Sequence, residues 1–317
     1  MSFGEGEEGV GIISPDVERV VSQGSLVQSP QRVIPVQPAN AALAELYTMI
    51  GLKKVKELAG ELEAFINVQR HRETYNLKNA PMVLHMVFKG NPGTGKTTVA
   101  RLFGKLFNSL QVLPKGHIIE VERADLVGEY IGHTAQKTRE KINKAMGGVL
   151  FIDEAYSLAR GGEKDFGKEA VDTLVKAMED YKNEFILILA GYTAPMDEFL
   201  RLNPGLKSRF PIQIHFPDYS VKELLDIGQL MLDERQYRLT NRALNKLGEI
   251  IDQYSNMPYN DFSNARLIRN LLETAIRRHA VRLRYVSHPT RDQLQTLESC
   301  DFLSGASNEY SLYGNLR

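Results

Sequence analysis

The spacing of apolar residues separates the chain into a central stretch and two flanks of different character. Between residues 84 and 216, short apolar runs alternate with segments in which apolar residues recur every three or four positions. The runs predict buried strands, and the recurring segments predict amphipathic helices. The predicted strands are 84–88, 117–121, 149–152, 185–190 and 212–216, and 168–181 is one of the helices between them. The alternation predicts an α/β fold in which a parallel sheet has helices on both faces.

The flanks lack this alternation. A helical pattern runs from about residue 41 to residue 75 with an interruption at Ile50-Gly51-Leu52, and a purely helical pattern follows the break at residues 216–220. The two ends of the chain are polar, contain glycines and predict loose tails. We therefore predict a tail over 1–38, an α/β domain over 39–217, a helical domain over 218–303 and a tail over 304–317.

A glycine-rich motif directly follows the first predicted strand and opens the next helix. Its residues are Gly90, Asn91, Pro92, Gly93, Thr94, Gly95, Lys96 and Thr97, with Thr98 after them. They match the phosphate-binding pattern G-x-x-x-x-G-K-[ST], in which backbone N–H groups and a helix N-terminus surround an anion. Lys96 is expected to bind the β- and γ-phosphates, and the Thr97 hydroxyl is expected to bind Mg²⁺. The motif predicts that the chain binds a nucleoside triphosphate.

Two carboxylates follow the third predicted strand, at Asp153 and Glu154. Ligands of parallel α/β sheets bind beyond the carboxyl ends of the strands, and both carboxylates are therefore expected to face the phosphates. Asp153 would hold Mg²⁺ through its water shell, while Glu154 would orient and activate the attacking water. Together the two motifs predict an ATPase that uses ATP and Mg²⁺.

The composition narrows the range of partners. The formal net charge is zero, which gives the chain as a whole no attraction to nucleic acid or to an anionic membrane. The single cysteine, Cys300, excludes an internal disulfide, and no apolar run reaches membrane-spanning length. The acidic start of the sequence is unlike a signal peptide, which favours a cytoplasmic protein. The histidines have no metal-ligand spacing, and we expect no metal beyond Mg²⁺.

Two further motifs, LNPGLKSRF at 202–210 and FSNARLIRN at 262–270, join the phosphate motif and the strand that ends in Asp153 and Glu154. With them, the chain resembles the AAA+ ATPases over roughly residues 40–303. Within that family it is similar to the branch that contains a sporulation ATPase and the red-type Rubisco activases (CbxX/CfqX-like proteins). The resemblance implies a P-loop core with a five-stranded parallel sheet, a small helical lid, and a homo-oligomeric ring of about six subunits with ATP at the interfaces.

The resemblance assigns roles to residues outside the phosphate motif. Arg209 matches the arginine that completes the ATP site of a neighbouring subunit. The alternative is an arginine at the edge of the sheet that is solvated or paired with a carboxylate. Arg266 matches the lid cation that contacts the γ-phosphate, whereas the arginines after it on the same helix, such as Arg269, are expected on a solvated face. Ile50 and Gly51 match the segment that recognises adenine.

Two segments depart from the family pattern, and the second of them also points to a protein partner. The tip of the fourth strand usually carries a polar sensor such as asparagine, and here either Tyr192 or Thr193 is expected to take that role. The loop after the second strand contains Glu129-Tyr130-Ile131-Gly132, where relatives often have a basic residue before the aromatic. The corresponding loop lines the channel of ring ATPases, which implies that Tyr130 grips a protein client. The alternative is a core tyrosine that packs the loop.

Three functions agree with these observations. The first is an ATP-hydrolysing ring that remodels a protein partner through its pore, in sporulation. A red-type Rubisco activase has the same chemistry and a different client. A nucleotide-gated binding switch would change its affinity for a partner without threading it. The sequence does not identify the client, the number of subunits or the role of the N-terminal tail.

Overall fold

The computed structural model describes residues 40–79, 82–130, 132–160, 166–256 and 262–302. The tails predicted over 1–38 and 304–317 lie outside the described residues. The helical pattern predicted near the N-terminal flank is present as two helices, α1 (Ala41–Thr48) and α2 (Lys53–Thr74), and they are separated at the predicted interruption.

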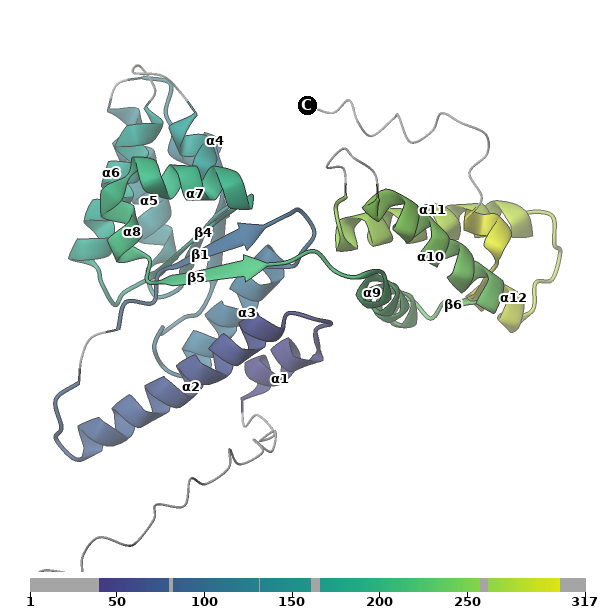
Figure 1. The fold of residues 1–317 in the computed structure, drawn as a ribbon, viewed down its shortest axis with the longest axis horizontal. Coiled ribbons are helices and arrows are strands. Elements are labelled where there is room, and N and C mark those ends of the chain that lie inside the picture. Colours follow the sequence, from purple (N-terminus) through teal and green to yellow (C-terminus); the bar gives the residue numbers. More distant parts are fainter. Residues whose placement is uncertain (1–39, 80–81, 131, 161–165, 257–261, 303–317) are drawn as a thin grey trace, which may run out of the picture. The chain divides into compact units, whose positions relative to one another are not determined.

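A five-stranded parallel sheet forms the centre of the fold, as predicted (Figure 1). Its strands lie in the order β2-β3-β4-β1-β5, and every neighbouring pair is parallel. The strand bounds are β1 Met86–Gly90, β2 Ile118–Val121, β3 Val149–Ile152, β4 Ile186–Gly191 and β5 Ile212–Phe216. The first strand therefore begins two residues later than predicted, because pairing with β4 and β5 starts at Met86.

Alternating strand residues face two separate hydrophobic cores, as the two-residue period of a strand requires. Met86 and Phe88 of β1 belong to a core with the helices α1, α2 and α3 (Lys96–Ser109), whereas Val87 belongs to the opposite core. The helices of the second core are α5 His133–Ala145, α6 Gly167–Asp180, α7 Thr193–Leu202 and α8 Pro204–Arg209, with α4 Arg123–Leu126 and the 3₁₀ helix η1 Ala155–Ala159 nearby. Both faces of the sheet are thus covered, as predicted.

After β5 the chain forms a helical region that corresponds to the predicted lid. Its helices are α9 Val221–Glu234, α10 Asn241–Ser255, α11 Ala265–Leu283 and α12 Arg291–Gln295, followed by the 3₁₀ helix η2 Ser299–Phe302. The prediction of a purely helical region was wrong in one respect. Two short strands, β6 (Arg238–Leu239) and β7 (Thr296–Leu297), pair in parallel. Two residues are too few to give a period in the sequence, which is why the pattern missed them.

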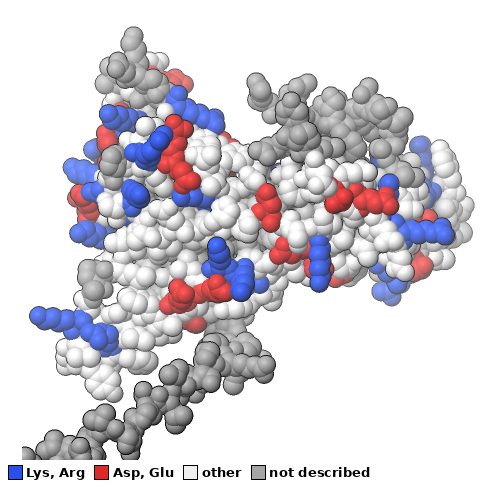
Figure 2. Space-filling view, viewed as in Figure 1, with Lys and Arg blue, Asp and Glu red and all other residues white. Residues whose placement is uncertain are grey.

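Charged side chains are mixed on the surface. Figure 2 shows lysine and arginine interspersed with aspartate and glutamate on the face in view, in keeping with the net charge of zero. Among the described residues, no helix is both long enough and apolar enough to cross a membrane.

Candidate active site

The glycine-rich motif forms a tight loop between β1 and α3. Gly93 and Gly95 have φ angles of 71° and 95°, which a side chain at either position would disfavour. A Cβ atom on Gly93 would also collide with the carbonyl of Ser263 in the lid region. Thr94 is buried, and its hydroxyl donates to the carbonyl of Asn91 at 2.8 Å. The loop is therefore held in one shape before the helix begins at Lys96.

Lys96 lies across the start of this loop. Its Nζ donates to the carbonyls of Gly90 and Asn91 at 2.8 and 2.7 Å. Burial lowers the pKa of Lys96, and the negative charge of Asp153 opposes that shift. The ammonium group is thus held by two neutral acceptors on the protein, and its charge is available to an anion at the loop.

The two carboxylates lie directly after β3, at the edge where the strand ends. Asp153 Oδ1 accepts from the backbone N–H of Glu154 at 3.0 Å. Glu154 has a φ angle of 45°, which is uncommon for a residue with a side chain and turns the chain sharply at this point. Burial, and after it the charge of Glu154, raises the pKa of Tyr156 to about 12, and that phenol therefore stays protonated beside the carboxylate.

Both carboxylates and all the predicted phosphate-binding residues except Asn91 and Thr94 line one cavity of about 270 Å³. Its lining consists of Gly90, Pro92, Gly93, Gly95, Lys96, Thr97, Thr98, Asp153, Glu154, Gly191, Tyr192, Ala265, Arg266 and Arg269. Four segments that are distant in the sequence therefore meet at the carboxyl ends of β1, β3 and β4, as the strand order requires.

Mg²⁺ commonly takes one or two protein oxygens, with phosphate and water oxygens completing its octahedron. The cavity offers the Thr97 hydroxyl and the Asp153 carboxylate, which fits that donor set. The described part of the chain contains no group of three or more histidine, cysteine, aspartate or glutamate side chains that could hold a metal by themselves.

Asn264 connects the phosphate loop to the lid region, and the sequence did not reveal it. It is fully buried and has a φ angle of 49°. Its Nδ2 donates to the Pro92 carbonyl at 3.2 Å and to Asp218 Oδ1 at 2.8 Å, and its Oδ1 accepts from the Tyr219 N–H at 2.9 Å. Asn91 Nδ2 donates to the same Asp218 carboxylate at 2.9 Å. We call Asn91, Asp218 and Asn264 the amide–carboxylate hub.

The lid contributes two arginines to the cavity. Arg266, as expected from its motif, lines it from the first turn of α11. Arg269 lines it as well, and its side chain is exposed, as expected. The spacing of three residues places Arg269 next to Arg266 on one face of a helix, and this spacing was the signal that could have identified it.

Ile50 and Gly51 do not line this cavity. Gly51 lies against Tyr219 and Glu223, and a Cβ atom there would approach the Tyr219 ring to 3.1 Å. The Tyr219 hydroxyl donates to the Thr94 carbonyl at 3.3 Å. Met49 and Leu52, on either side of the segment, lie beside Gly95, and the segment therefore adjoins the phosphate loop.

Arg209 also lies outside the cavity. Its guanidinium forms an ion pair with Glu179 of α6 and donates to the carbonyl of Gly205 at 2.6 Å. This pairing with a carboxylate is the alternative that we considered for it from the sequence.

The remaining predicted residues differ in exposure and position. Tyr130 is 66% exposed, which disagrees with a core tyrosine, and its ring packs edge-on against His133. Ile131 lies outside the described residues. Of the two candidates for the sensor, Tyr192 lines the cavity, whereas Thr193 is the first residue of α7.

Comparison with known proteins gives matches over both regions of the chain. The family model "ATPase family associated with various cellular activities (AAA)" matches residues 86–218, and the model "AAA lid domain" matches residues 220–310. Stage V sporulation protein K of Bacillus subtilis is 57% identical over 258 residues, which cover 81% of this chain and 80% of that protein. Protein CbbX of Cereibacter sphaeroides is 48% identical, covering 74% of this chain and 76% of that protein.

A further relative is the chloroplastic ribulose bisphosphate carboxylase/oxygenase activase of Cyanidioschyzon merolae, which is 46% identical over 74% of this chain and 80% of that protein. Among solved structures, a mutant form of RuvB from Thermotoga maritima aligns with a TM-score of 0.53 at 21% identity, over 81% of this chain and 70% of that chain. At that level of identity the likeness concerns the fold alone.

Proposed function

This chain belongs to the AAA ATPase family and hydrolyses ATP, and from that premise we propose that it works as a ring that remodels a protein partner. The observation that carries the proposal is the cavity where Lys96, Glu154 and Arg266 meet, because it joins a phosphate cradle to a carboxylate and to a cation of the lid. The proposal treats residues 39–217 and 218–303 as two domains whose angle changes with the bound nucleotide.

At the phosphate loop, we assign phosphate binding to the backbone and to the Lys96 side chain. The N–H groups of the glycine-rich loop and the Lys96 ammonium bind the phosphates, and Thr98 lines the cavity beside them. Thr97 and Asp153 would hold Mg²⁺, which supplies charge neutralisation when bound. Ile50 and Gly51 would flank the adenine.

We assign the hydrolytic step to Glu154, which accepts a proton from the attacking water. Its positive-φ backbone supports this role, since strained residues are enriched at functional sites. Tyr192 is the better candidate for the sensor, because its side chain lines the same cavity. Arg266 would contact the γ-phosphate from the lid, and the amide–carboxylate hub would transmit a shift of the phosphate loop to α11.

Arg209 would complete the site of a neighbouring subunit in a homo-oligomer, and we propose a hexamer. Its position outside the cavity of its own chain agrees with this role. Glu179 would hold the guanidinium extended from α8 until it meets a neighbouring site. A planar guanidinium that reaches the transferred phosphate is worth about 10³-fold or more in rate.

Mixing two inactive variants tests this arrangement. Arg209→Ala subunits keep Lys96, and Lys96→Ala subunits keep Arg209, so random mixing rebuilds an intact site at about a quarter of the interfaces of a ring. We expect the mixture to regain ATP hydrolysis that neither variant has alone. Arg201→Ala, which removes an exposed arginine nearby, serves as the control and should stay active by itself. If subunits exchange and no activity returns, Arg209 does not act in a neighbouring site.

The exposed Tyr130 supports a protein client as the object of the remodelling. The names of the relatives give two settings, because one is a sporulation protein and another is an activase of ribulose bisphosphate carboxylase/oxygenase. We propose sporulation as the setting, since the sporulation relative has 57% identity and the activase 46%. Affinity capture with an ATP-bound Glu154→Gln trap would identify the client, and recovery of a Rubisco subunit would favour the activase.

A nucleotide-gated switch that does not thread its partner is the alternative from another functional class. Both functions need ATP, but only threading needs the aromatic grip. Stimulation of hydrolysis by the captured client, with loss of that stimulation in Tyr130→Ala, would support the ring that threads. Stimulation that persists in this variant would support the switch.

A further inference from the structure

The helix α11 begins against the phosphate loop and carries two arginines there. The N–H group of Ala265 donates to the Gly93 carbonyl at 3.2 Å, and a Cβ atom on Gly93 would lie only 2.9 Å from the backbone nitrogen of Arg266. Arg266 and Arg269 both line the cavity of about 270 Å³, which we call the nucleotide cavity. Arg269 lies about 4.5 Å further along the helix, and helical side chains lean towards the N-terminus. Both guanidinium groups are therefore within reach of one anion at the loop.

The position of these two arginines is unfavourable for the protein alone. The N-terminus of a helix carries a partial positive charge, and like charges three residues apart on a helix repel each other. The first turn of α11 contains no acidic residue, whereas α9 and α12 have Glu223 and Asp292 in their first turns. The positive charge at this end of α11 is therefore not offset within the helix, and an anion between the helix and the loop would offset it.

Neither arginine is neutralised by a carboxylate. In the part of the chain that the structure describes, Arg266 and Arg269 form no ion pair, and the side chain of Arg269 is exposed. Later on the same helix, by contrast, Arg282 pairs with Glu298 and Asp301 at 2.8 and 3.0 Å. The charged groups of the cavity lining are Lys96, Arg266, Arg269, Asp153 and Glu154. Cations thus outnumber carboxylates, which favours an anionic ligand.

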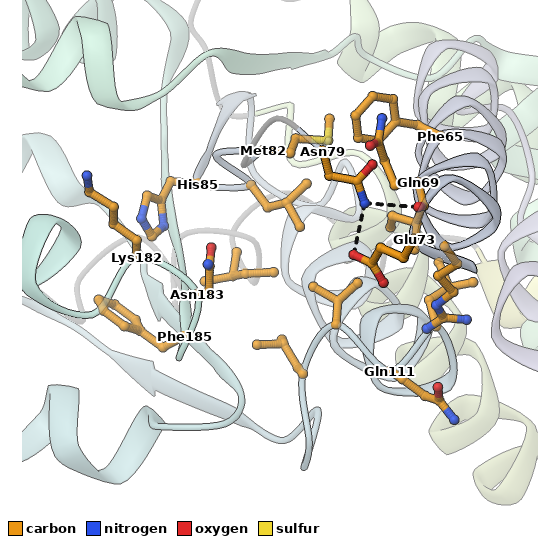
Figure 3. Close-up of a pocket in the computed structure, with 17 residues that line it drawn as sticks. Phe65, Gln69, Glu73, Asn79, Met82, His85, Gln111, Lys182, Asn183 and Phe185 are labelled. Atoms are coloured by element: carbon orange, nitrogen blue, oxygen red, sulfur yellow. Dashed lines mark hydrogen bonds between the residues drawn. The ribbon is translucent and has the colours of Figure 1, made fainter. Parts of the chain in front are cut away.

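A larger cavity, of about 470 Å³, shows the usual arrangement of charges on a helix. It lies beside the beginning of β1 and β4, and its wall includes apolar side chains such as Leu113 (Figure 3). Arg70 and Glu73 of α2 line it three residues apart, so the helical spacing joins opposite charges. Glu73 also accepts a hydrogen bond from the Asn79 amide at 2.9 Å (Figure 3). Like charges at this spacing are thus a feature of the nucleotide cavity that the helix beside the larger cavity does not share.

We propose that Arg269 is a second lid cation of the nucleotide site, which binds the terminal phosphate of ATP together with Arg266 and makes the site favour ATP over ADP. The inference rests on the proposed function, because it takes this cavity to hold the phosphates of ATP. A guanidinium presents several N–H donors in one plane, and two guanidinium groups can share the oxygens of one phosphate. ADP has no terminal phosphate and less negative charge, so it gains less from the second cation.

Nucleotide affinity tests this role in Glu154→Gln, the variant expected to bind ATP without hydrolysing it. Adding Arg269→Gln removes the charge and keeps most of the length of the side chain. By calorimetry, we expect the Kd for ATP to rise about tenfold and the Kd for ADP by less than about threefold, as for a charged hydrogen bond at an exposed position. Arg269→Lys should recover most of the ATP affinity, because the charge remains. Arg277→Gln makes the same change at an exposed position two turns later, outside the cavity, and should alter neither Kd.

Lys96→Ala in the same Glu154→Gln background separates a failure of this inference from a failure of the proposed function. If Lys96→Ala abolishes ATP binding while Arg269→Gln leaves the Kd for ATP unchanged, Arg269 does not bind the phosphate. Equal weakening of ATP and ADP by Arg269→Gln, or a lower Tm, would show a structural role and would also overturn the inference. If Lys96→Ala keeps its affinity for ATP, the cavity does not hold the phosphates, and the proposed function fails together with the role of Arg269.

Discussion

The two edges of the central sheet differ in the polarity of their side chains and in the conformation of their backbone. At the carboxyl ends of its strands the chain turns through residues with positive φ, such as Gly95 and Glu154, and presents charged groups to a polar cavity. At the amino ends it packs leucine, phenylalanine and isoleucine side chains around a cavity whose unpartnered atoms belong to neutral amides. Every strand of the parallel sheet runs from one edge to the other, and α3 begins at the polar cavity and ends beside the apolar one.

The difference shows how a parallel sheet can separate activity from stability. Strained backbone and concentrated charge cost stability and are tolerated where they serve chemistry. Close packing of apolar side chains supplies stability and has no catalytic group to offer. We therefore expect substitutions at the carboxyl edge to change turnover, and substitutions at the amino edge to change the free energy of unfolding.

The largest effect is expected at the carboxyl edge. Lys96→Ala should remove measurable ATP binding, because the phosphates lose their main side-chain partner. Glu154→Gln should keep ATP binding and slow hydrolysis by about 10²–10⁴-fold, since an amide cannot accept the proton of the attacking water. Nucleotide affinity by calorimetry and hydrolysis rates under single-turnover conditions distinguish the two. An equal loss of affinity in both variants would contradict the separate roles.

The next largest effect is expected at the amino edge, from Leu113→Ala. Leu113 is 1% exposed and lines the apolar cavity, and its truncation should cost about 2–5 kcal/mol in the free energy of unfolding. Urea denaturation measures this loss, and Leu202→Ala, at a position that is 61% exposed, is the control. The folded variant should hydrolyse ATP at an unchanged rate. A fall in the hydrolysis rate as large as that of Glu154→Gln would contradict the separation of activity from stability between the two edges.

His85 makes the amino edge sensitive to acid. Burial lowers its pKa from 6.5 to about 4, so the unfolded chain takes up a proton that the folded chain resists. The free energy of unfolding is therefore highest above pH 6.5, and it falls by about 3 kcal/mol in total as the pH decreases towards 4.

His85→Asn keeps an acceptor near the Leu187 N–H and cannot titrate in this range. The free energy of unfolding of this variant should therefore fall less steeply between pH 6.5 and pH 4 than that of the unaltered protein. His71→Asn, at an exposed position, should leave the slope unchanged. Parallel slopes for all three proteins would show that His85 does not cause the sensitivity.

The smallest effect is expected from Tyr130→Ala, in the loop that follows β2. Because the side chain is 66% exposed, the free energy of unfolding should change by no more than about 0.5 kcal/mol, and basal hydrolysis should stay within a few fold. Work on the client should disappear, whereas Tyr130→Phe should retain it, because the grip needs the ring and not the hydroxyl. A large drop in the Tm of Tyr130→Ala would show that Tyr130 packs the loop and does not grip a client.

Most of the sheet could be predicted from the sequence because its strands are buried on both faces. Residues 149–152 form a continuous apolar run, and the strand bounds there are those predicted. The strands β6 and β7 escaped the prediction, since each has two residues and depends on a partner almost 60 positions away, as the pairing of Arg238 with Thr296 illustrates.

The site divides in the same way. Lys96, Asp153 and Glu154 could be expected at one cavity, which they line, because they lie in local motifs next to predicted strands. The amide–carboxylate hub joins Asn91, Asp218 and Asn264, and no local pattern marks three residues that meet only after folding. Arg269 is exposed, as expected, but a row of arginines on one helix does not reveal which of them lines a cavity.

The bond from Asn264 to the Pro92 carbonyl spans 172 residues, and this separation has a consequence for biogenesis. At about 5–20 residues per second, a ribosome needs roughly ten to thirty seconds to proceed from the phosphate loop to Asn264. During that interval the nascent chain has its nucleotide loop but neither the hub nor Arg266. In the mechanism that we propose, newly made chains consume no ATP until the lid region has emerged and docked, and the order of synthesis itself delays the onset of activity.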